Sequence, residues 1–215
     1  MSEKRRVKEL FSTMSKKEKV KYLWEYYRYY LFGLIFVIAV TVFLVNEQSG
    51  QKEYALTIHV LADSVYSTEI EKIEQRLNEE ILSEEERETH EVSIQVLPYS
   101  SNPADVTTVQ ATLQRLVAEI SVGDLDVVFI DKNQYEIMNR EEYFYNLNEL
   151  IDGSLPVEEQ FIFYDANGQA VGIDSSGVPL FNQVIGGTEP VVMGVLRNTK
   201  REDKIKELFN VLFEK

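Results

Sequence analysis

The pattern of apolar and polar positions changes character twice along the chain. Residues 1–28 mix charged and apolar positions, residues 29–46 carry no formal charge, and residues 54–215 alternate strand-type and helix-type patterns. The middle run, YYLFGLIFVIAVTVFLVN, contains twelve Leu, Ile, Val or Phe residues. As a helix it would reach about 27 Å, close to the roughly 30 Å hydrocarbon core of a bilayer. The run predicts a single transmembrane helix over residues 29–46.

The C-terminal part reads as strands that alternate with helices. Over residues 68–82 the apolar positions recur every three or four residues, which is typical of a helix with one buried face. Short apolar runs such as DVVFID, residues 126–131, are typical of strands buried on both faces. Such alternation predicts an α/β fold with a mostly parallel sheet and flanking helices. The expected strands are 54–62, 91–97, 126–131, 161–164, 169–173 and 189–196; the expected helices are 68–82, 105–122, 132–140 and 201–213, with a turn or helix over 143–150 and a charged loop over 83–91.

Charge divides the chain at the apolar run. The whole chain has a formal net charge of -14, yet residues 1–28 hold nine Lys or Arg against four acids. Because basic flanks stay on the cytoplasmic side, we expect a cytoplasmic N-terminus and an extracytoplasmic C-terminal domain in the cell membrane. The expected division is a cytoplasmic basic segment at 1–28, a span at 29–46, a linker at 47–53 and an α/β domain at 54–215.

The residues before the apolar run are typical of a membrane interface. Aromatic rings and basic side chains favour the headgroup level, where they contact the lipid bilayer. The expected interface residues are Lys21, Tyr22, Trp24, Tyr26, Tyr27, Arg28, Tyr29 and Tyr30. A buried core helix and a cleaved signal peptide are the alternatives, but the sequence FLVNEQSG offers no small-x-small cleavage site. Residues 1–21 could lie on the inner leaflet as an amphipathic helix or be a solvated positive segment, and both remain open.

Composition excludes several kinds of chemistry. The chain has no cysteine, which rules out disulfides, thiolate zinc sites and a cysteine-linked lipid anchor. The acidic balance argues against nucleic acid as a partner, because phosphate contacts need a basic surface. An exterior domain without cysteine is more typical of a Gram-positive cell surface than of a disulfide-forming secretory pathway.

Polar residues follow three of the expected strands. In open α/β sheets, ligands bind outside the carboxyl ends of the strands, at the switch in strand order. That rule selects as candidate ligand-binding residues Asp63, Ser64, Tyr99, Ser100, Ser101, Asp131 and Asn133. Capping of the following helices explains the same residue types without a ligand. The isolated His59 and His90, and the absence of a nucleophile motif, predict no metal, no cofactor and no catalytic residue.

Two segments carry a resemblance to a known family. VQATLQRLVAEISVGDLDVVFID, residues 109–131, and VVMGVLRNTKREDKIKELFNVL, residues 191–212, resemble segments of the extracellular solute-binding proteins of bacterial ABC importers. The resemblance implies a sheet of the periplasmic-binding-protein type. That family has two lobes and a cysteine-linked lipid in Gram-positive members, whereas this chain offers about 165 outer residues, the size of one domain, and no cysteine.

The function that follows is that of a membrane-anchored binding or sensing module, or an accessory part of a membrane assembly, with a small solute or a membrane protein as partner. The alternative is a membrane-anchored interaction or scaffold protein without a small-molecule ligand. A polar pocket at the strand ends favours the first, and an exposed apolar patch favours the second. We do not expect an enzyme, because no converging set of titratable residues is visible.

Overall fold

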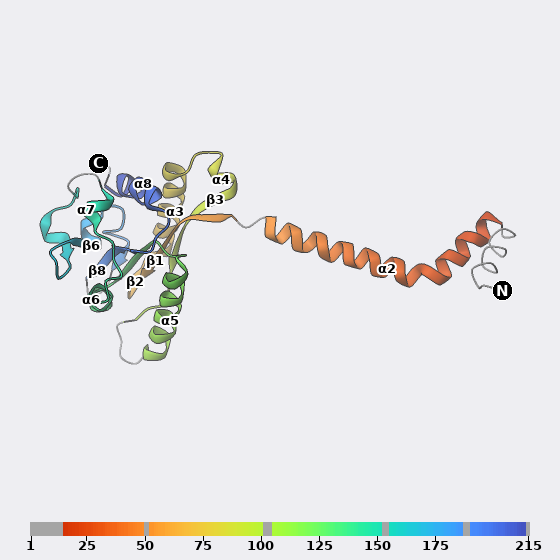
Figure 1. Ribbon diagram of the computed structural model, residues 1–215, viewed down its shortest axis with the longest axis horizontal. Helices are drawn as coiled ribbons and strands as arrows, with labels where there is room; N and C mark the ends of the chain where they lie inside the picture. The colour runs from red at the N-terminus through yellow and green to blue at the C-terminus, as the bar shows by residue number, and fades with distance from the viewer. Residues whose placement is uncertain (1–14, 50–51, 101–104, 152–154, 187–189, 214–215) are drawn as a thin grey trace. The chain divides into compact units, whose positions relative to one another are not determined.

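The computed structural model describes residues 15–49, 52–100, 105–151, 155–186 and 190–213. The chain divides into two compact units, residues 1–51 and residues 52–215. The first unit contains helix α2 (Lys16–Ser49), and the second is an α/β domain (Figure 1).

Helix α2 is continuous over 34 residues and includes the whole uncharged run. In the part of the chain that the structure describes, no helix is both long enough and apolar enough to cross a membrane, so the span predicted over residues 29–46 is unsupported there.

Six of the eight predicted interface residues have described side chains, and all six are exposed: Lys21, Trp24, Tyr27, Arg28, Tyr29 and Tyr30. The side chains of Tyr22 and Tyr26 lie outside the described residues. Arg28 donates from Nη2 to the Tyr29 hydroxyl at 2.8 Å, and its guanidinium lies 4.7 Å from the centre of that ring. The stretch therefore presents aromatic and basic groups along its surface, and their place at a membrane interface stays a prediction.

The domain is built on a six-stranded sheet with the order β3-β1-β4-β8-β6-β5. Its strands are β1 (Glu53–Leu61), β3 (His90–Val96), β4 (Val127–Asp131), β5 (Ile162–Tyr164), β6 (Ala170–Asp174) and β8 (Val191–Val195). β3, β1 and β4 are parallel, whereas β8, β6 and β5 are each antiparallel to their neighbour. A separate antiparallel pair joins β2 (Ser64–Val65) to β7 (Ile185–Gly186). The α/β fold is confirmed, with a sheet that is mixed.

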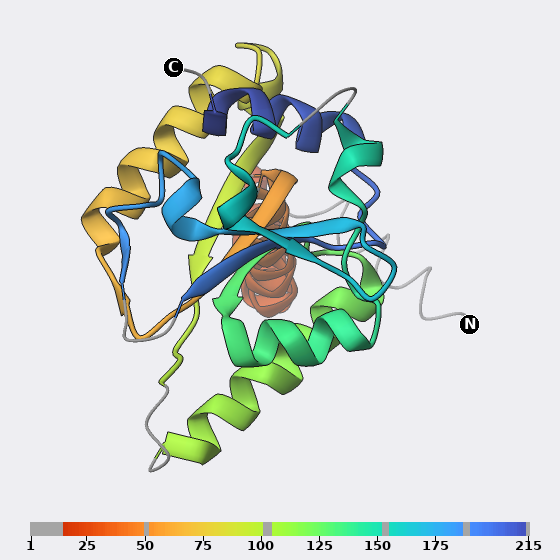
Figure 2. The ribbon, with the colours of Figure 1, turned by 90° about the vertical axis from the view of Figure 1, so that its left-hand side faces the viewer.

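Helices cover both faces of the sheet (Figure 2). α3 (Ser67–Ile81) and α8 (Glu202–Phe213) pack on one face, while α5 (Val106–Val122) and α6 (Lys132–Arg140) pack on the other. The short elements are α4 (Glu86–Thr89), α7 (Leu147–Leu150) and the 3-10 turns η2 (Glu159–Phe161) and η3 (Ser175–Gly177). The chain thus winds to both sides of β1, because α3 leads to β3 on one side and α5 leads to β4 on the other.

Strand β1 presents different chemistry to the two faces. Leu56, Ile58 and Val60 belong to the core under α3 and α8. Thr57 and His59 alternate with them and therefore point to the α5 face, although both are almost completely buried. This places two polar side chains between the sheet and α5.

The segment expected as a charged loop, residues 83–91, contains helix α4 and the first residues of β3. A capping box begins the helix: Glu86 N donates to Ser83 Oγ at 3.3 Å, and Ser83 N donates to Glu86 Oε2 at 2.9 Å. Glu86 also pairs with Lys204 of α8 at 3.1 Å. The Ser83 backbone N–H, the Ser83 hydroxyl and Lys204 lower the pKa of Glu86 to about 2.

Side chains of α3 cover the free edge of β3. Asn78 accepts from Val92 N at 2.9 Å and donates to Val92 O at 2.8 Å. Glu74 accepts from Ile94 N at 2.8 Å. The backbone of this edge strand is therefore occupied at Val92 and Ile94, which disfavours pairing with a strand of another chain.

Candidate functional site

The carboxyl ends of the parallel strands bring two of the predicted ligand-binding residues together. The Tyr99 hydroxyl, after β3, donates a hydrogen bond to Asp131 Oδ2 at the end of β4. Burial, this hydrogen bond and the charges of Asp131 and Asp63 all raise the pKa of Tyr99. Tyr99 is therefore a neutral donor at physiological pH, and it is already engaged by a residue of its own chain.

Asp131 also caps helix α6. Its Oδ1 accepts from Asn133 N at 2.9 Å and from Gln134 N at 3.3 Å, so both carboxylate oxygens have partners inside the chain. Ser64 lies in β2, Ser100 is half-buried, and Ser101 lies outside the described residues. Asp131 thus has the contacts of a capping residue, and ligand binding at this end of the sheet stays a prediction.

A different hollow lies on the α5 face, around the pair formed by His59 of β1 and Gln95 of β3. It has a volume of about 510 Å³ and is lined by residues of β1, β3, α5 and the segment before α8. We call it the His59 groove, because the His59 ring lines it at the centre of β1. A volume of this size lies within the range of small-molecule sites.

A chain of polar contacts crosses the groove. Arg115 Nε lies 2.7 Å from Glu119 Oε1, and Arg115 Nη2 donates to Gln95 Oε1 at 2.9 Å. Glu119 Oε2 lies 3.3 Å from His59 Nδ1, although the alignment is not that of a hydrogen bond. Burial lowers the pKa of His59, Glu119 opposes this shift and Arg115 reinforces it. The imidazole is therefore neutral near pH 7, beside a charged pair on α5.

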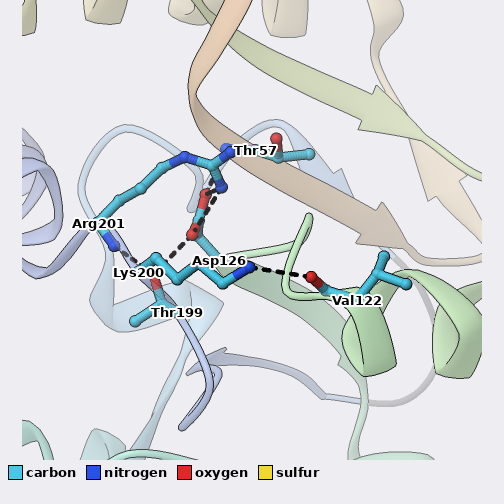
Figure 3. Close-up of polar contacts among 6 residues, drawn as sticks. All are labelled: Thr57, Val122, Asp126, Thr199, Lys200 and Arg201. Carbon is cyan, nitrogen blue, oxygen red and sulfur yellow. Dashed lines mark hydrogen bonds and ion pairs between the residues drawn. The ribbon is translucent and has the colours of Figure 1, made fainter.

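One side of the groove is fixed by the buried carboxylate of Asp126 (Figure 3). Asp126 is fully buried and accepts hydrogen bonds from Thr57 N at 2.9 Å and from Thr199 Oγ1 at 2.6 Å. Arg201 Nη1 lies 3.0 Å from Oδ2 and 3.2 Å from Oδ1 of the same carboxylate. These contacts hold β1, the start of β4 and the start of α8 in one arrangement.

The segment before α8 also holds the end of α5. Lys200 Nζ donates to Val122 O at 3.2 Å (Figure 3). Asn198 Nδ2 donates to Ile120 O. Gly123 ends the helix with a φ of 75°, a left-handed conformation that favours glycine. The helix that carries Arg115 and Glu119 is therefore fixed at its C-terminal end, next to the groove.

The sequence contained a signal for this groove that the strand-end rule does not use. Thr57 and His59 are the polar positions of an otherwise apolar strand, and Arg115 and Glu119 are spaced to lie on one side of a helix. His59 is isolated from the other histidine in the sequence, but Glu119, sixty residues later in the chain, lies beside its ring. The fold alone brings them together.

Thr57 contributes a buried hydroxyl to the groove. Its Oγ1 has no hydrogen-bond partner among the described residues, so none of them is placed as a base for that hydroxyl. Among these same residues, no group of three His, Cys, Asp or Glu side chains is placed to hold a metal ion. What the groove offers is a set of charged and polar groups of both signs around a buried imidazole.

Comparisons of the chain with protein-family models, with curated proteins and with solved structures gave no match. The interpretation of the groove rests on its own geometry.

Proposed function

We propose that the chain is a single-pass membrane protein whose acidic outer domain is a binding module and not an enzyme. The observation that carries the proposal is the junction of an uncharged 18-residue run, within one continuous helix, to a separately packed α/β domain. The first feature suits an anchor, and the second suits a module that works at the outer surface.

The amino-acid sequence supports the anchor, and the side chains of residues 43–49 lie outside the described part of the chain. On the insertion scale, the twelve Leu, Ile, Val and Phe residues contribute roughly -4 to -7 kcal/mol, more than Gly33 and Thr41 cost. The basic flank of residues 1–28 favours a cytoplasmic N-terminus. The exposed rings around Arg28 suit the headgroup region.

The binding role is supported by the His59 groove. Its volume suits a small molecule, and its polar lining comes from four separate segments that the fold fixes together. We also retain the likeness to a single lobe of the solute-binding proteins of ABC importers as part of the proposal. Because residues 52–215 form one compact unit, no closure of two lobes around a solute is proposed.

Thermal unfolding of the detergent-purified full chain against a library of amino acids, sugars and short peptides tests the binding role. A ligand at one hundred times its dissociation constant should add about 2.7 kcal/mol to the free energy of unfolding. A shift that is lost when Glu119 is replaced by Gln supports binding in the groove. A library that shifts nothing contradicts the binding role, and release of the chain from vesicles by alkaline carbonate contradicts the anchor.

A second candidate function is an interaction protein, and an incompletely covered face of α5 favours it. The helix buries only Thr112, Leu116 and Ile120, whereas Val106 and Val117 on the adjoining side are each about half exposed (50% and 49%). Pull-down of a membrane partner that is lost in V117D, together with a library that shifts nothing, would select this function. Retention of the partner by V117D would exclude this face of α5 as its docking site.

A further inference from the structure

The charges around the His59 groove are nearly balanced. Three basic residues line it, Lys52, Arg115 and Arg201, and three acidic residues, Glu53, Glu119 and Asp124. The charge of Arg201 is neutralised by its two contacts to the buried carboxylate of Asp126. The remaining lining groups therefore carry two positive and three negative charges, which a ligand must meet together.

Groups of both signs retain hydrogen-bonding capacity. Arg115 uses Nε and Nη2 in contacts to Glu119 and Gln95, while Nη1 has no hydrogen bond among the described residues. Its side chain is 53% exposed. Asp124 lines the same groove, and its carboxylate has no hydrogen bond or ion pair among the described residues. A guanidinium donor and a carboxylate acceptor are thus both available to a ligand.

We infer that the His59 groove binds a small zwitterion of amino-acid to dipeptide size, with its carboxylate at Arg115 and its ammonium group at Glu119 and Asp124. The inference rests on the proposed binding function and names its ligand class. A monovalent anion would pair with Arg115 but would be repelled by the acidic groups. A monovalent cation would pair with the acidic groups but would be repelled by Arg115. A zwitterion pairs with both signs, and the volume of about 510 Å³ accommodates a molecule of that size.

The floor of the groove suits a polar ligand without adding charge. His59 is 1% exposed and neutral near pH 7, and Thr57 is buried beside it on the same face of β1. Tyr54, about half exposed, contributes an aromatic wall at one side. The carboxylate and ammonium groups of the ligand therefore determine its recognition, because the charged side chains lie around this neutral floor.

The test measures the unfolding temperature of the full chain in detergent with each of four chemical forms of the same dipeptides. Alanyl dipeptides whose second side chain is uncharged are used as the free zwitterion, the N-acetylated anion, the amidated cation and the doubly blocked neutral form. We expect the zwitterion to raise the unfolding temperature and the three other forms to bind at least about tenfold more weakly, as expected for loss of a charged hydrogen bond.

The matched variants are R115Q and R76Q. Arg76 pairs with Glu80 on α3 at 2.7 Å with the same i,i+4 spacing as Arg115 and Glu119 on α5, but it lies outside the groove. R115Q should weaken binding of the zwitterion at least about tenfold, and R76Q should leave it unchanged. An equal effect of both variants would place the ligand elsewhere and overturn the inference.

The outcomes separate this inference from the proposed function. If a blocked dipeptide binds as tightly as the zwitterion, or if only a sugar binds, the zwitterion inference is refuted. The proposal that the domain is a binding module is not affected by that result. No binding by any dipeptide form or by the wider library overturns both.

Discussion

Replacing Asp126 by asparagine removes the buried negative charge on which three segments of the domain converge. The carboxylate has no exposed surface and accepts from Thr57 N, Thr199 Oγ1 and Arg201 Nη1. The amide of D126N retains one acceptor oxygen, so it cannot satisfy all of these donors at once. The variant therefore leaves the Arg201 guanidinium without its counter-charge in a partly buried position.

The magnitude follows from the exposure of the two partners. Removing one member of a buried ion pair costs about 3–5 kcal/mol, and water can partly solvate Arg201, whose side chain is 26% exposed, so we expect a loss of about 3 kcal/mol. For a domain of this size each kcal/mol lowers the unfolding temperature by about 2–4 °C, which gives a decrease of about 6–12 °C. Differential scanning calorimetry of the full chain measures it.

The control is E142Q, which breaks the surface pair between Glu142 and Arg197 at 3.2 Å. Both of those side chains are more than half exposed, so the loss should stay below about 1 kcal/mol. D126N should also cost less in an R201Q background than in the native chain, because the two residues share one network. Equal unfolding temperatures for D126N and E142Q would refute the reasoning.

Three further changes test other parts of the fold by the same calorimetry. G123A should cost about 1–2 kcal/mol, because φ is 75° and alanine is strained there; an unchanged unfolding temperature would contradict it. G194A places a methyl carbon against the buried Phe144 ring and should cost about 1–3 kcal/mol; an unfolding temperature equal to that of the native chain would refute this. Glu86 has a pKa lowered from 4.5 to about 2 in the folded chain, so its contribution is present above pH 4.5 and is lost as pH falls from 4.5 to 2. E86Q should flatten the decline of stability in that window, and an unaltered decline would show that other groups cause it.

Local periodicity identified the longer helices of the domain because each buries one defined face. Ile70, Ile73, Leu77 and Ile81 recur at helical spacing, and all four are buried in α3. The strands around residues 54–62 and 126–131 likewise lie within one residue of β1 and β4. Local pattern is sufficient where a single face meets the core.

The direction of the later strands could not be predicted in this way. β8 is buried at every position, and a fully buried strand has the same pattern in parallel and antiparallel pairs. Its antiparallel pairing with β4 depends on the path of residues 140–190, whose described part contains only short elements. The sequence contains the capping-box spacing of α4 in Ser83 and Glu86, but the run of charged residues around it indicated a loop.

The candidate site shows the same limit. The strand-end rule selected Tyr99 and Asp131 as ligand-binding candidates, and the structure shows these two side chains hydrogen-bonded to each other. The His59 groove combines residues from positions 52 to 201, and its key neighbours, His59 and Glu119, are distant in sequence. No spacing rule predicts a contact of that kind, because it depends on how α5 packs against β1.

The orientation of the anchor is tested most directly by cysteine labelling, since the native chain has no cysteine to remove. S15C places a thiol at an exposed position before the helix, and E84C places one at an exposed position of the α/β domain. With a membrane-impermeant maleimide on intact cells, we expect labelling of E84C and labelling of S15C only after permeabilisation. Labelling of S15C on intact cells, or protection of E84C until the membrane is opened, would contradict an outer binding module held by residues 29–46.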